Sequence, residues 1–68
     1  MPNFTEIEKH LDKVEFELND AQMLIDEARH LPMQTTEFSL DLDVKQLQLN
    51  VHRAKIAHAR NAAEYLRQ

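Results

Sequence analysis

The sequence predicts an all-α protein, an antiparallel two-helix hairpin that dimerises into a four-helix bundle. Apolar residues recur at steps of three and four in each half of the chain, which is the spacing of one helix face. Pro32 lies near the middle of the 68 residues and marks a break between two helices. The chain has no glycine and no cysteine, which argues against tight β-hairpin turns, phosphate-binding loops and disulfides. We therefore expect one helical domain over residues 1–68.

The first helix is expected over residues 4–31. Its apolar seam has an unbroken heptad pattern made of Ile7, Leu11, Val14, Leu18, Ala21, Ile25 and Ala28. Asn3 and Thr5 each stand three residues before a glutamate, so either residue fits the N-terminal cap. The helix is expected to end at Leu31, because Pro32 disfavours helical geometry in the residue before it.

A loop over residues 32–38 should lead to a second helix over residues 39–67. The seam expected to pack on the first helix consists of Leu40, Val44, Leu47, Val51 and Ala54. Residues 1–34 hold eight acids and three bases, whereas residues 35–68 hold four acids and five bases. Antiparallel pairing lays the basic end of the second helix beside the acidic start of the first, and this favours the hairpin orientation.

The second helix carries another apolar stripe on its opposite side, and a shorter apolar patch lies on the outer side of the first helix. Long apolar stripes seldom stay exposed to water, so we expect them to be contact surfaces for a second copy or a heterologous protein partner. The residues of this expected interface are Phe16, Met23, Leu42, Leu49, Ile56, Ala59, Ala63 and Leu66.

These patterns indicate a non-enzymatic protein–protein interaction module, such as a small regulator, adaptor or chaperone subunit, acting through a self-associating helical hairpin. We expect no catalytic residues, cofactor or metal. Glu27 and His30 have the Glu-x-x-His spacing of di-iron bundles, but both lie off the seam. His58 extends the seam of the second helix, either as a polar end that fixes register or as a pH-sensitive contact.

An alternative function is an RNA- or DNA-binding regulator, in which Arg53, Lys55 and Arg60 contact phosphates. In length and architecture the expected fold resembles the RNA-binding helical-hairpin dimers that control plasmid copy number, although no motif is shared. That resemblance implies a dimer that binds nucleic acid through its helices. No apolar run approaches a membrane span and no signal peptide is evident, so we expect a cytoplasmic protein without membrane contact.

Overall fold

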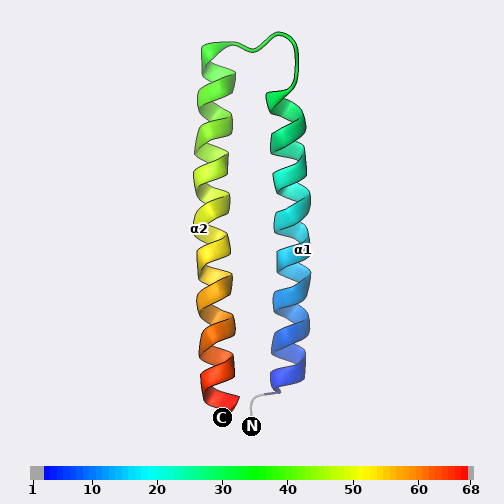
Figure 1. Ribbon diagram of the computed structural model, residues 1–68, viewed down its shortest axis with the longest axis vertical. Coiled ribbons are helices and arrows are strands. Elements are labelled where there is room, and N and C mark those ends of the chain that lie inside the picture. The colour runs from blue at the N-terminus through cyan, green and yellow to red at the C-terminus, as the bar shows by residue number, and fades with distance from the viewer. Residues whose placement is uncertain (1–2, 68) are drawn as a thin grey trace.

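The computed structural model describes residues 3–67 as two long α-helices that lie side by side and antiparallel (Figure 1). Helix α1 spans Phe4–Arg29 and helix α2 spans Thr36–Arg67. The hairpin is 52 Å long and 15 by 13 Å across, and both termini lie at the end opposite the loop. The expected all-α hairpin is confirmed, and residues 3–67 contain no strand.

The helix starts are set by side-chain caps. The Asn3 side chain accepts a hydrogen bond of 3.2 Å from the backbone N–H of Glu6, so Asn3 rather than Thr5 caps α1. The Thr35 hydroxyl accepts a bond of 3.1 Å from the backbone N–H of Phe38. This cap starts α2 at Thr36, three residues earlier than the sequence predicts, and it places Ser39 inside the helix.

The end of α1 also differs slightly from the prediction. The last helical residue is Arg29, and His30 forms the cap by donating its backbone N–H to the Glu27 carbonyl oxygen at 3.1 Å. The side-chain amide of Gln34 reaches back and donates to the Ala28 carbonyl oxygen at 2.7 Å. Loop groups therefore satisfy carbonyls that the end of a helix leaves without partners.

The apolar seam of α1 is confirmed as the face that packs on α2. Leu11 and Ile25 are buried, and most other seam residues are half-buried between the helices. Ile7, near the open end of the hairpin, is the seam residue with the greatest exposure. The heptad spacing of α1 therefore identifies its inward side correctly.

The two apolar stripes of α2 have the opposite roles to those predicted. Leu42 and Leu49 are only 4% and 5% exposed, because they pack against α1, and Ile56, Ala59 and Ala63 are half-buried. The predicted hairpin seam instead lies open to solvent, with exposed fractions of 52% to 65% at Leu40, Val44, Leu47 and Val51. The prediction that the Leu42 stripe faces away from α1 is wrong.

The reason for this reversal lies in the residues beside each stripe. Three arginines stand next to the Leu42 stripe at heptad spacing and all contact α1: Arg60 and Arg67 pair with carboxylates, and Arg53 bonds to Asn19. Near the loop, Asp43 pairs with Arg29 of α1 at 3.0 Å, whereas Asp41, beside the other stripe, pairs with Lys45 of its own helix at 2.7 Å. These polar contacts with α1 favour the orientation in which the Leu42 stripe faces α1.

No helix within residues 3–67 combines the length and the apolar composition that crossing a bilayer would require.

Candidate interaction surface

A ladder of polar contacts holds the two helices together along one side of the hairpin. Arg67 pairs with Glu8 at 2.5 Å and Arg60 pairs with Glu15 at 2.7 Å, one heptad further along each helix. Nearer the loop, the side-chain amides of Gln22 and Gln46 hydrogen-bond at 2.7 Å. These contacts fix the antiparallel register, because a shift of one helix along the other would break all of them together.

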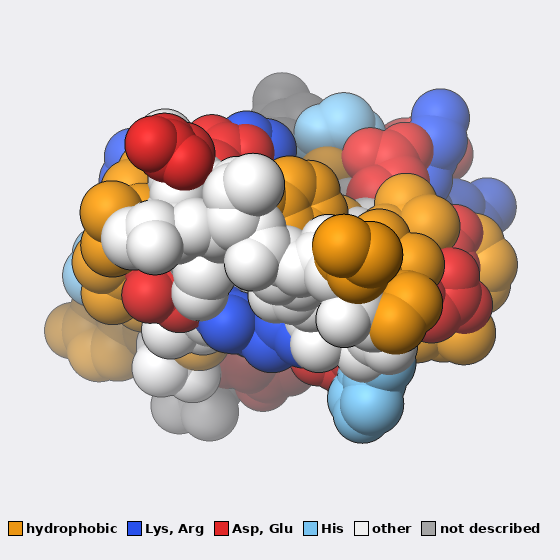
Figure 2. Space-filling view, turned by 90° about the horizontal axis from the view of Figure 1, so that it is seen from above, with side chains coloured by type: hydrophobic (Ala, Val, Ile, Leu, Met, Phe, Trp, Pro, Cys, Tyr) orange, Lys and Arg blue, Asp and Glu red, His pale blue; other side chains and the backbone are white. Residues whose placement is uncertain are grey.

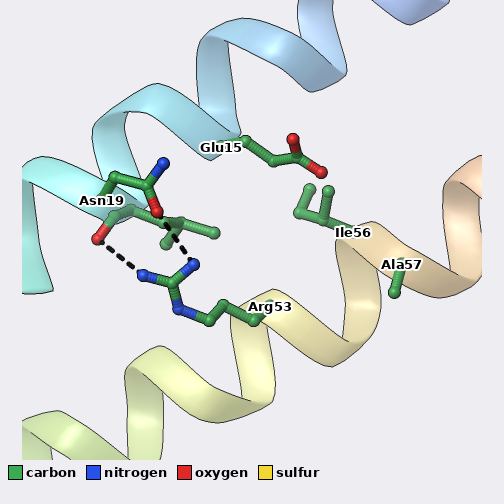
Figure 3. A pocket seen from close by; sticks show the side chains of 6 residues that line it. Glu15, Asn19, Arg53, Ile56 and Ala57 are labelled. Carbon is green, nitrogen blue, oxygen red and sulfur yellow. Dashed lines mark hydrogen bonds between the residues drawn. The ribbon is translucent and has the colours of Figure 1, made fainter.

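Arg53 continues this ladder in the middle of the hairpin (Figure 3). Its guanidinium donates to the Asn19 side-chain oxygen at 3.0 Å and to the Leu18 carbonyl oxygen at 3.4 Å. Figure 3 shows both bonds crossing from α2 to α1, with Ile56 projecting from the next turn of α2. The Arg53 side chain therefore stabilises the contact between α1 and α2 of its own chain.

Arg60 is the most strongly engaged cation among the described residues. It contacts two carboxylates of α1, Glu15 at 2.7 Å and Asp12 at 2.5 Å. The hydrogen bond to Glu15, followed by the one to Asp12, raises the pKa of Arg60 above its usual range. Arg53 and Arg60, two of the three residues predicted to contact phosphates, thus have partners within the chain, whereas Lys55 is exposed.

The side of α2 that points away from α1 is the largest apolar feature left open on that helix. We call Leu40, Val44, Leu47 and Val51 the outer face of α2. Val44, Leu47 and Val51 line a groove, which Gln48, His52 and Lys55 border on one side. Because these four aliphatic residues recur at heptad spacing on a rigid helix, they form a continuous stripe suited to a second helix.

The residues predicted as an interface are divided by the structure. Phe16, Met23 and Leu66 lie exposed, whereas the others of the eight lie between the helices of the same chain. Leu24, which was not predicted, is also exposed on α1. Seen from the loop end, hydrophobic side chains gather at several separate places among charged ones (Figure 2). The arginines at heptad spacing beside the Leu42 stripe are the sequence signal that could have identified the stripe that faces α1.

Glu27 and His30, which have the spacing of a di-iron motif, both lie exposed at the C-terminal end of α1. The His30 ring nitrogen Nδ1 lies 2.6 Å from the Asp26 carbonyl oxygen, which gives this ring a capping contact at the end of α1. Within residues 3–67 no group of three or more histidine, cysteine or acidic side chains is arranged to hold a metal ion. The arrangement instead offers an apolar helix face flanked by polar residues.

Comparison with protein families, curated proteins and solved structures finds no match for this chain.

Proposed function

We propose that this protein is a non-enzymatic protein–protein interaction module, a small regulator, adaptor or chaperone subunit that binds through the outer face of α2. One observation carries the proposal: four large aliphatic side chains, each more than half exposed, follow one another in heptad register. Exposed apolar stripes of this kind mark contact sites, and an amphipathic helix in a partner can cover them. The function is therefore recognition of a helical surface.

Burial of this face would contribute favourable free energy to an association. Complete burial of a leucine or valine side chain contributes roughly 1.5–3 kcal/mol. More than half of each of the four side chains remains to be buried, so each can contribute about 1 kcal/mol or more on binding. A partner that also pairs with the polar residues beside the stripe would add specificity.

The small core of the hairpin supports the same proposal. Within residues 3–67 the buried hydrophobic side chains are Leu11, Ile25, Leu42 and Leu49, and each keeps 4–8% of its surface exposed. A domain of this size gains little stability from a core that small, and association is a common remedy. Two hairpins that share the outer face would form a four-helix assembly. The lack of cysteine fits a reducing compartment such as the cytoplasm.

A photo-cross-linking experiment in the native host tests this proposal. A photoreactive amino acid replaces Leu47 in the centre of the outer face, and in a control variant it replaces Glu17 on the exposed side of α1. We expect a discrete protein adduct, either of the chain with itself or with another protein, from position 47 and not from position 17. Equal labelling at the two positions, or none at position 47, would refute the proposal.

Nucleic-acid binding is the weaker alternative on this geometry. Phosphate contacts need Lys or Arg side chains that are free to neutralise phosphates and so displace the counterions of the nucleic acid. Arg53 donates to Asn19, and the charge of Arg60 is already met by two carboxylates.

A further inference from the structure

We infer that the partner of the outer face of α2 is the same face of a second copy, packed antiparallel about a two-fold axis level with Leu49. This inference rests on the proposed function and names its partner. The two-fold arrangement is argued from the charges beside the stripe and from the order of side chains along it.

The charges beside the stripe complement one another only in the antiparallel arrangement. Asp41 and Lys55 lie at the same heptad position, on the same edge of the outer face and on opposite sides of Leu49. In antiparallel helices, equivalent edges face each other, so Asp41 of each copy lies opposite Lys55 of the other. The two residues are offset by about 3 Å along the axis, given a rise of ~1.5 Å per residue.

A parallel pair would gain no such contact. In a parallel pair, the edge that carries Asp41 and Lys55 faces the opposite edge of the partner's stripe. Each residue on it then lies opposite the partner residue whose number is five lower. Asp41 would then lie opposite Thr36, and Lys55 opposite Asn50. Neither combination joins opposite charges, so the charge pattern favours the antiparallel form.

The apolar side chains also fill the antiparallel arrangement in layers. About the axis at Leu49, Leu47 meets Val51 of the second copy, and Val44 meets Ala54 of the second copy. In each layer a larger side chain lies opposite a smaller one, leucine opposite valine and valine opposite alanine, which lets the two helices pack closely. The two-fold axis repeats each layer once on its other side. Both copies use the same surface, so the assembly ends at the dimer.

The proposal identifies Asp41 and Lys55 as the residues that set the orientation of the pair, and charge reversal tests this. Reversing either charge, as in Lys55→Asp or Asp41→Lys, turns two attractive pairs between the copies into two repulsive ones. Asp41→Lys also breaks the pair that Asp41 forms with Lys45 of its own helix at 2.7 Å, so Lys55→Asp is the cleaner test. We expect each change to raise the dimer dissociation constant about tenfold, measured by light scattering across protein concentrations. The double variant Asp41→Lys/Lys55→Asp should return to within about threefold of the original value.

The control for these variants is Lys13→Asp. Lys13 is exposed on α1, so this change alters the net charge as much as Lys55→Asp does but leaves the outer face intact. It should leave the dissociation constant within about twofold. Circular dichroism checks that every variant remains helical. Equal weakening by Lys13→Asp, or a double variant no stronger than the single ones, would overturn the assignment of the Asp41–Lys55 pair.

Disulfide trapping tests the orientation independently, because the chain has no cysteine of its own. In the antiparallel pair, position 40 meets position 58 of the second copy, about 27 Å from that copy's own position 40 at ~1.5 Å per residue. Mixing Leu40→Cys with His58→Cys under mild oxidation should give a cross-linked heterodimer, whereas neither variant should cross-link alone. Cross-linking of each single variant with itself would show a parallel pair and overturn the proposal.

Failure of this inference can be distinguished from failure of the proposed function. A purified chain that stays monomeric and forms no mixed disulfide excludes the second copy. If the photo-cross-linker at Leu47 still captures a different protein, the interaction function stands and only the identity of the partner is wrong. If it captures nothing, both proposals fall.

Discussion

Two leucines that stand two residues apart on α2 provide a matched test of which stripe closes the hairpin. Leu49 is 5% exposed against α1, whereas Leu47 is 65% exposed on the outer face. Leu→Ala removes the same atoms and makes the same change in helix propensity at both positions, so any difference in stability reflects packing alone.

The expected magnitudes follow from these exposures. Truncation removes Cγ and both Cδ atoms, which at about 0.8 kcal/mol per buried carbon are worth about 2.4 kcal/mol when fully buried. Nearly all of this is lost in Leu49→Ala, and any cavity adds to the cost. In an isolated hairpin only about a third of the Leu47 side chain is buried, so Leu47→Ala should lose about a third of this free energy, roughly 0.8 kcal/mol. The whole chain, at roughly 0.05–0.15 kcal/mol per residue, is stable by only about 3–10 kcal/mol.

Urea unfolding followed by circular dichroism measures both losses. Leu49→Ala should lower the unfolding free energy by about 2–3 kcal/mol at every protein concentration, because each chain loses its own core. The smaller loss in Leu47→Ala should grow with protein concentration, since it also weakens association. A larger loss at Leu47 than at Leu49 in dilute protein would show that α2 packs on α1 through the other stripe, as the heptad pattern alone suggested.

Three further predictions concern caps, charges and nucleic acid. Asn3→Ala should cost about 1 kcal/mol of stability through loss of the cap, whereas Thr5→Ala should cost much less; equal losses in thermal melts would refute the assignment. Arg60→Gln should lower the melting temperature at low salt, because it removes the ion pair with Glu15. The difference from the original chain should shrink at 1 M salt, where the Debye length falls to ~3 Å and screens the charges. A decrease in melting temperature that salt does not change would contradict an electrostatic role. Fluorescence anisotropy should detect no binding to duplex RNA at low salt, since Arg53 and Arg60 are engaged within the hairpin; tight, salt-sensitive binding abolished by Lys55→Gln would count against this account.

The sequence was sufficient to predict the helical hairpin and the inward side of α1. Periodicity alone marks that side, because the opposite positions of α1 hold mostly polar residues, with Phe16 and Met23 as exceptions. The end near Pro32 was also predictable to within two residues, since the proline restricts the residue before it.

The orientation of α2 could not be read from periodicity, because both of its stripes are apolar. Hydrophobic burial is non-directional and does not distinguish Leu47 from Leu49 in the sequence. The choice depends on long-range contacts of Arg53 and Arg60 with α1, which join residues 34 or more positions apart. The candidate surface was misplaced for the same reason, since the stripe that does not meet α1 becomes the open one.

Sedimentation equilibrium of the purified chain beside Leu47→Glu tests most directly whether copies meet through the outer face of α2. With rising concentration, the mass of the original chain should approach twice its 8.0 kDa, while Leu47→Glu should remain at 8.0 kDa and stay helical. A charge at this exposed position should harm only an association that buries it. The account would be contradicted by an original chain that keeps the single-chain mass at every concentration, or by a Leu47→Glu variant that associates equally well.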